Sequence, residues 1–263
     1  MVVWGIPEES ARGFFQQAGQ KVTEWEEILS RYRPGSEVFD LNHRAFREEV
    51  PVSDRLWNVL LQSVDYSNRT RGYFDCTRGY LYDEVKRGGI MKQAIASEII
   101  DRIRLNASAK TVFFLCPDVA LDFGGMGKGI ALNDLAEELV QWGIENAFIS
   151  FGNSSVLTRG RHPHGDYWPF SLAGGKADGK IWELTNDAVS VSSSPAGERE
   201  GSCHHIANPR TGQTPQSRRS VVVRARNPVD AEVLSTCLLA APENEQYDWV
   251  YSFGNVEIEI ING

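Results

Sequence analysis

The sequence predicts an α+β protein, with antiparallel sheets and helices packed on one side of them. Apolar residues recur at helical spacing mainly in the first third of the chain, whereas short strands and turns dominate after about residue 155. No proline-, glycine- or serine-rich linker interrupts the 263 residues, and 41% of them are hydrophobic, which is enough to bury a sizeable core. We therefore expect a single domain over residues 1–263.

Three helices are expected before residue 105. Residues 8–31 place apolar side chains at the spacing of one helix face. Ser53 is a typical N-cap for a second helix, whose inner face carries Leu56, Val59, Leu60 and Val64. The spacing of Ile95, Ile99 and Ile103 predicts a third helix.

The remainder predicts strands interrupted by two helices. Residues 112–115 and 120–123 are expected to pair as strands around the turn Pro117-Asp118. A helix through residues 132–140 should end at Gly143, because glycine is favoured just past a helix C-terminus. Further strands are predicted at 147–151, 168–173, 180–185, 188–192, 220–225 and 256–260, with a helix at 229–241.

The charge balance limits the possible partners. The chain has 27 Lys and Arg against 35 Asp and Glu, a formal net charge of −8. This argues against binding nucleic acid, which requires a basic face, but it permits a compact site for a phosphorylated small molecule. No apolar run is long enough for an integral membrane segment. The four cysteines are widely spaced and form no CxxC pair, so we expect buried free thiols.

A glycine-rich loop, residues 122–129 (DFGGMGKG), joins a predicted strand to a predicted helix. Glycines allow close backbone approach and positive φ, and a helix start offers free N–H groups to an anion. The loop is neither a dinucleotide fingerprint, because Ile130 replaces the third glycine, nor a P-loop, because Gly129 stands where Ser or Thr is required. Phosphate binding and a simple tight turn both fit it.

Two other segments carry polar groups suited to catalysis. Residues 204–212 (HHIANPRTG) hold His204, His205, Arg210 and Thr211, which could supply an acid or base and a phosphate grip, or could form only a packed strand and a hairpin turn. Glu232 and Thr236 lie four residues apart on a predicted helix and so share one face. Their oxygen atoms suit Mg²⁺, although most such pairs are ordinary surface residues.

Taken in order, these segments resemble the FAD:protein FMN transferases, the ApbE-type flavin transferases. The resemblance covers about residues 25–242. It is carried by LSRY with Ser36 and LN at 29–42, by FDCTRGYL at 74–81, and by the three segments DFGGMGKG (122–129), HHIANPRTG (204–212) and AEVLSTCL (231–238).

The resemblance implies a Mg²⁺-dependent enzyme that binds FAD and moves its FMN half onto a threonine hydroxyl of an acceptor flavoprotein subunit, releasing AMP. It also implies a fold of fused T-fold-like units. By this resemblance, Glu232, Thr236 and the backbone carbonyl of Gly127 would hold the metal, and His205 or its neighbour His204 would activate the acceptor hydroxyl. The FAD-binding residues would be Asn42, Asp75, Thr77, Gly124, Gly125, Lys128, Ser193, Arg210 and Thr211.

Several positions depart from the family pattern. Glu232 replaces an aspartate, Asn208 replaces the aspartate of the DPRTG segment, and Asn153-Ser154 follows Gly152 in place of a Gly-Asp or Gly-Asn pair. Ser192-Ser193-Ser194 replaces Thr-Ser-Gly, and the family's N-terminal strand motif is missing or truncated. Two alternatives therefore stay open: an FAD- or FMN-binding protein without protein transfer, and an FAD pyrophosphatase that yields FMN and AMP.

The N-terminus leaves localisation open. It has neither the basic nor the apolar region of a secretory signal, so the sequence as it stands predicts a cytoplasmic protein. The family that the sequence resembles is commonly exported, so removal of an N-terminal signal would make the protein periplasmic.

Overall fold

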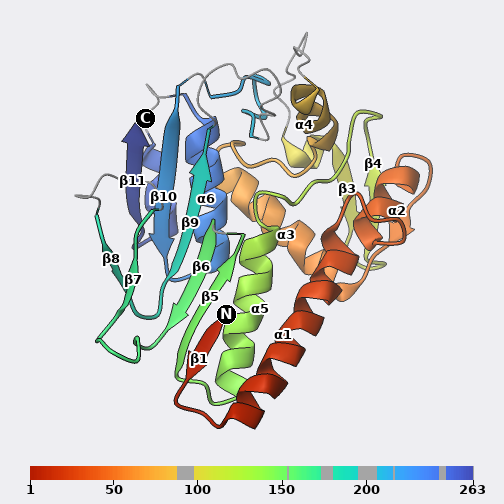
Figure 1. The fold of residues 1–263 in the computed structure, drawn as a ribbon. Coiled ribbons are helices and arrows are strands. Elements are labelled where there is room, and N and C mark those ends of the chain that lie inside the picture. Colours follow the sequence, from red (N-terminus) through yellow and green to blue (C-terminus); the bar gives the residue numbers. More distant parts are fainter. Residues whose placement is uncertain are drawn as a thin grey trace.

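A computed structural model describes residues 1–87, 98–152, 154–172, 180–194, 206–215, 217–242 and 247–262. Its main sheet has six antiparallel strands in the order β1-β5-β6-β9-β10-β11 (Figure 1). They are β1 (Val2–Trp4), β5 (Asn146–Phe151), β6 (Ser155–Arg159), β9 (Ala188–Ser193), β10 (Arg219–Ala225) and β11 (Glu257–Asn262). The predicted α+β class with antiparallel sheets is confirmed.

Two smaller antiparallel sheets accompany the main one. The first has the order β2-β4-β3 and the second is a two-stranded ribbon. Their strands are β2 (Val50–Pro51), β3 (Ile103–Asn106), β4 (Thr111–Phe114), β7 (Trp168–Phe170) and β8 (Trp182–Leu184).

Three helices form layers over one face of the main sheet (Figure 1). Helix α6 (Pro228–Ala240) lies directly on β9 and β10, α5 (Gly127–Gln141) packs against α6, and α1 (Glu8–Leu29) packs against α5. The other helices are α2 (Glu37–Arg44), α3 (Asp54–Arg69) and α4 (Gly79–Lys86), with short 3-10 helices η1 (Ile99–Asp101) and η2 (Asp248–Phe253).

The opposite face of the sheet is covered by the β7–β8 ribbon. Trp168 and Trp182 of the ribbon pack with Val156, Val189 and Val222 of the sheet in a separate apolar cluster. Because side chains alternate between the faces of a strand, the neighbouring residues Leu157, Ala188, Val221 and Val223 join the larger core under the helices. Strands β6, β9 and β10 therefore carry buried apolar residues on both faces.

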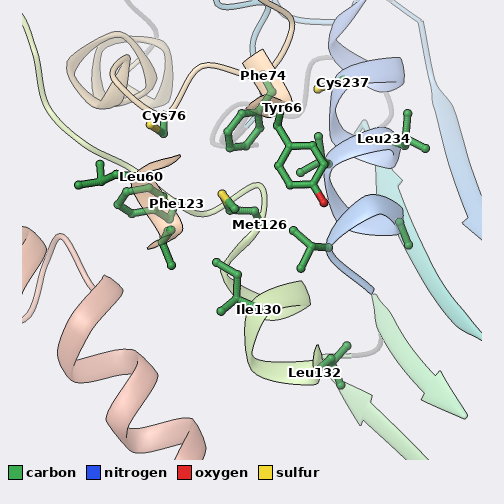
Figure 2. Packing of buried hydrophobic residues seen from close by; sticks show 14 of the residues in the cluster. Leu60, Tyr66, Phe74, Cys76, Phe123, Met126, Ile130, Leu132, Leu234 and Cys237 are labelled. Carbon is green, nitrogen blue, oxygen red and sulfur yellow. The ribbon is translucent and has the colours of Figure 1, made fainter. Parts of the chain in front are cut away.

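The core beneath the glycine loop is dense and aromatic. Phe123 and Met126 are buried side chains within that loop, and Figure 2 shows Met126 near Phe74 and Tyr66, beside α6. The Ser63 hydroxyl of α3 lies 3.3 Å from the Met126 sulfur. The buried side chains of Phe123 and Met126 therefore attach the loop to the core.

Several predicted elements are confirmed. Helix α1 occupies most of the predicted span 8–31, and the Ser53 hydroxyl accepts a hydrogen bond from the Leu56 N–H at the start of α3. Helix α5 ends at Gln141, just before Gly143, whose φ is +64°. The strands predicted near 147, 168, 180, 188, 220 and 256 and the helix predicted at 229–241 correspond to β5, β7, β8, β9, β10, β11 and α6.

Two predictions before residue 125 are wrong. The helix expected through Ile95, Ile99 and Ile103 does not extend to Ile103, which begins β3, because pairing with β4 outweighs the helical spacing; Ile95 lies outside the described residues. Residues 120–123 form no strand with 112–115: β4 pairs with β2 and β3, and Ala120 makes only an isolated bridge to Arg78. Helices α2 and α4 were not predicted, because eight residues carry little periodic signal.

Within the described residues, no helix is both long and apolar enough to cross a membrane. Cys76 and Cys237 are buried free thiols, as expected, and Cys116 is a half-buried one. Cys203 lies outside the described residues.

Candidate functional site

The glycine loop turns its backbone outward because its apolar side chains turn inward. The N–H groups of Met126 and Gly127 donate to the Phe123 carbonyl at 3.0 and 2.7 Å, which closes a tight turn at the start of α5. Gly124 and Gly125 lie in this turn and line a cavity. Close approach, and not positive φ, explains these glycines, since no glycine from 124 to 129 has a φ in the left-handed region.

Gly129 brings two helices together beneath the loop. A Cβ at this position would lie 2.7 Å from the Pro228 carbonyl oxygen and from the Val229 Cα, both backbone atoms of α6. Only glycine therefore permits this spacing of α5 and α6. The contact places Lys128 of α5 opposite Glu232 of α6.

Lys128 and Glu232 form the central ion pair of the site. The Lys128 Nζ donates to Glu232 Oε2 at 2.8 Å, and the lysine side chain is 41% exposed whereas the glutamate side chain is 3% exposed. The buried carboxylate is thus reached from the cavity side by a cation. Thr236, one turn further along α6, faces the loop, because a Cβ on Gly125 would lie 3.5 Å from its methyl group.

Two cavities meet at the glycine loop. The first, of about 270 Å³, is lined by the loop, by Asp75, Tyr82, Ser192 and Thr236, and by Ile206 and Ala207. The second, of about 450 Å³, is largely apolar and is lined by the C-terminal half of α1, including Trp25 and Leu29, together with Tyr32 and Gly127. Asp122, Gly124 and Lys128 line both cavities, so the loop forms their common wall.

The segment from Asp75 to Arg78 is held by internal polar contacts. The Asp75 carboxylate accepts from the Thr77 N–H and hydroxyl at 2.8 and 2.6 Å and from Arg78 Nε at 2.9 Å. Thr77 is fully buried and also accepts from Arg102 Nε at 2.9 Å, so it positions Asp75 and does not line either cavity. Asp75 does line the first cavity.

Tyr82 places a hydroxyl group at the wall of the first cavity. It donates to the Asp75 carbonyl at 3.1 Å. Burial, reinforced by the negative charges of Asp75 and Asp122, raises the pKa of Tyr82 well above its ordinary value. The group is therefore a neutral hydrogen-bond donor throughout the physiological range.

The remaining predicted site residues are distributed unevenly. Asn42 lies behind the loop, where its side-chain amide donates to the Leu121 carbonyl at 3.0 Å and accepts from the Leu121 N–H at 2.7 Å. Ser193 lines the first cavity, and its hydroxyl contacts that of Ser220 at 2.8 Å. Arg210 and Thr211 are exposed and line neither cavity, although the Arg210 guanidinium lies 5.3 Å from the ring centre of Tyr73, a wall residue.

His204 and His205 lie outside the described residues. The next residues along the chain, Ile206 and Ala207, line the first cavity. The end of the histidine segment therefore reaches the site.

Sequence reasoning missed a group of serine hydroxyls around Glu232. Ser155 of β6, Ser190 and Ser192 of β9, and Ser235 of α6 are buried there and hydrogen-bonded to Glu232 or to one another. A signal was present in β9, because Ser190 and Ser192 alternate with Val189 and Val191 and so occupy one face. The cavity residues Tyr73, Tyr82 and Trp25 were also missed.

The site offers oxygen donors that could hold Mg²⁺. Glu232 Oε2 contacts the ammonium group of Lys128, and the Thr236 hydroxyl lies one turn further along α6. A carboxylate and a hydroxyl fit Mg²⁺ when substrate phosphates complete the coordination. Within the described part of the chain, no cluster of three or more His, Cys, Asp or Glu side chains could form a metal site by itself.

Comparison with known proteins identifies the family. The sequence profile of the ApbE family matches residues 2–260. The chain belongs to the ApbE family. Its relatives are FAD:protein FMN transferases, and the chain is an enzyme of this flavin transferase family.

The ApbE relatives are distant in sequence and close in fold. The FAD:protein FMN transferase of Klebsiella pneumoniae is 28% identical, covering 83% of this chain and 72% of that protein, and that of Chlamydia trachomatis is 25% identical, covering 89% and 79%. Among solved structures, the flavin transferase ApbE from Vibrio cholerae has a TM-score of 0.79 at 20% identity, covering 98% of this chain and 86% of that one. The ApbE protein of Thermotoga maritima has a TM-score of 0.78 at 20% identity, covering 95% and 86%.

Proposed function

We propose that this chain transfers the FMN half of FAD to a threonine hydroxyl of an acceptor flavoprotein, releases AMP, and requires Mg²⁺. The observation that carries the proposal is the meeting of two cavities at one loop, with Lys128 and Glu232 beside it. FAD has the matching form, since two large ring systems flank a central diphosphate. The loop would hold the diphosphate, and the cavities would hold the two ends.

The loop, Lys128 and the start of α5 would bind the diphosphate. Backbone N–H groups at a helix N-terminus and an ammonium group both favour a negatively charged ligand. The carboxylates of Asp75, Asp122 and Glu232 lie close to Lys128 and limit the positively charged region to a small area, in keeping with the net charge of −8. The FAD phosphates would thus compete with Glu232 for Lys128.

Glu232, Thr236 and the carbonyl of Gly127 would hold the metal ion. When bound with FAD, Mg²⁺ would neutralise charge on the diphosphate and on the departing AMP. The protein's own part is to present Glu232 Oε2 and the Thr236 hydroxyl beside the loop. Gly127 lines the second cavity, at the first turn of α5.

The transfer forms one bond and breaks another at the same phosphorus. The threonine oxygen of the acceptor attacks the FMN-side phosphorus, the bond from that phosphorus to the bridging oxygen breaks, and AMP leaves with the bridging oxygen. We assign the removal of the threonine proton to His205 or His204, which would act as general base. Residues 1–263 would act as a single catalytic domain of fused T-fold-like units.

The deciding experiment incubates the protein with FAD, Mg²⁺ and an acceptor flavoprotein domain that carries the threonine. We expect a covalent FMN adduct by mass spectrometry and an equal amount of AMP, and neither product with a Thr→Ala acceptor. Free FMN with AMP would instead show a pyrophosphatase, and FAD binding without AMP would show a binding protein. Both of those results contradict the proposal.

A variant at the expected metal ligand tests the site assignment. Glu232→Ala should lower Mg²⁺-dependent AMP release by about 100-fold or more. Removing a residue that only hydrogen-bonds to a metal ligand already costs about 10- to 100-fold, and removing the ligand itself should cost more. The rate should be measured over a range of Mg²⁺ concentrations. Unchanged turnover at each concentration would place the metal elsewhere.

A further inference from the structure

The Glu232 carboxylate is held from two sides. Its Oε1 accepts hydrogen bonds from the hydroxyls of Ser155 on β6 and Ser190 on β9, the latter at 2.8 Å. Its Oε2 accepts from Lys128 at 2.8 Å. One oxygen therefore faces the sheet and the other faces Lys128.

The serines belong to a larger hydroxyl network under α6. Ser190 lies 2.9 Å from Ser235, and Ser235 lies 2.9 Å from Ser192. Ser192 extends the network to Thr236 at 3.5 Å. The network thus connects the two side chains that we expect to hold the metal.

The length of Glu232 is matched to these serines. An aspartate would place its carboxylate about 1.5 Å, one carbon–carbon bond, further from the sheet. Ser155 and Ser190 then could not both reach it with the present helix position. A glutamate also has one more rotatable bond, so it needs more fixed contacts to present its oxygens in one orientation.

We propose that Ser155 and Ser190 are positioning residues, which fix Glu232 so that only Oε2 is presented to the metal. This inference rests on the proposed function, because the metal is expected there. Neither serine lines either cavity, so the two act through the carboxylate that they orient. Hydrogen-bond partners of metal ligands have this effect on affinity in general.

A purely structural role would predict a different result. If the hydroxyls only satisfied a buried charge, their loss would lower stability and leave metal affinity unchanged. The two roles are separated by measuring both quantities on the same variants. Ser67→Ala is a matched control, because Ser67 is a buried serine on α3 outside this network.

The experiment titrates the full chain with Mn²⁺, a paramagnetic substitute for Mg²⁺, and follows free Mn²⁺ by electron paramagnetic resonance. Ser155→Ala/Ser190→Ala should bind Mn²⁺ about 10- to 100-fold more weakly than wild type. Ser67→Ala should keep wild-type affinity, as should Ser190→Thr, which retains the hydroxyl. If the double variant does not fold, the single variant Ser190→Ala decides by the same measurement.

Coupling to Glu232 provides the second measurement. Glu232→Asp should weaken Mn²⁺ binding in the wild-type background but add little in the double-alanine background, because the contacts that it loses are already gone. Equal effects in both backgrounds would overturn the inference. So would unchanged Mn²⁺ affinity in a folded double variant, or absence of Mn²⁺ binding by the wild type.

The two proposals fail in distinguishable ways. Mn²⁺ binding that depends on the serines, without FMN transfer to any acceptor, would overturn the proposed function alone. FMN transfer together with Mn²⁺ binding that is insensitive to the serines would overturn this inference alone.

Discussion

At the scale of single residues, Lys128 and Glu232 form the ion pair beside the glycine loop. Glu232 is nearly fully buried and Lys128 is partly exposed, so the lysine can leave the pair more easily than the glutamate can. A lysine has a long flexible stem and a compact charge, which suits exchange between two anionic partners. In this structure Lys128 contacts the carboxylate oxygen that we assign to the metal.

Lys128→Met tests this competition. We expect the free protein to bind Mn²⁺ more tightly than wild type, because no ammonium group occupies Glu232 Oε2. The KM for FAD should rise about tenfold, because a charge-assisted contact to the diphosphate is lost. Mn²⁺ titration and FAD-dependent AMP release measure the two effects. Weaker Mn²⁺ binding would mean that lysine and metal do not share this oxygen.

At the scale of elements, Arg31 connects the segment after α1 to α4 and to the glycine loop. Its guanidinium donates to the Gly79 carbonyl and to Asp122, both at 2.9 Å, and to Asp83 at 2.5 Å. The arginine side chain is only 9% exposed. Asp122 borders both cavities, so this contact fixes the loop against the neighbouring helices.

Arg31→Ala should destabilise the protein by about 3 kcal/mol, because it leaves two carboxylates, partly buried, without their cation. Arg31→Lys should recover only part of this, since lysine cannot make the forked contacts. Urea denaturation at pH 7 measures both changes. A loss below about 0.5 kcal/mol, the usual value for an exposed pair, would contradict this role.

At the scale of the whole molecule, one large core joins the helices to the sheet. It includes residues from Phe14 to Phe253 and contains the free thiols of Cys76 and Cys237. Burial raises the pKa of both thiols, and burial followed by the nearby Asp230 carboxylate raises the pKa of Tyr66. These groups must stay protonated in the folded protein.

The stability should therefore fall at alkaline pH. A group whose pKa is raised by folding contributes stability that is present below its unfolded pKa and lost as the pH rises toward its folded pKa. The loss should begin near an unfolded thiol pKa of about 8.5, steepen above about 10 as Tyr66 and Tyr82 join, and reach up to about 1.4 kcal/mol per pH unit for each group.

Urea denaturation between pH 7 and pH 10.5, under reducing conditions, measures this dependence. The control is Cys76→Ala/Cys237→Ala, which removes both buried thiols and should flatten the decline between pH 8.5 and pH 10. An equal decline in the variant and the wild type would assign the alkaline sensitivity to other groups.

The sequence by itself determined the class of the fold and most elements after residue 127. Helix α5 and strands β9 and β10 follow from local spacing, because periodicities of 3.6 and 2 are properties of neighbouring residues. It also identified the glycine loop and the pair Glu232 and Thr236. It could not predict β3 in place of a helix, because that strand depends on pairing with β4.

Only the tertiary structure decided which groups meet. Glu232 contacts Ser155 and Ser190, which precede it by 77 and 42 residues, and contacts Lys128, 104 residues earlier. Such contacts depend on how closely α5, α6 and the sheet approach one another, and Gly129 sets part of that distance. It likewise decided that Thr77 and Asn42 support the site from behind, whereas Asp75 lines the cavity. Burial of a side chain results from packing between distant segments, so it cannot be predicted from local sequence.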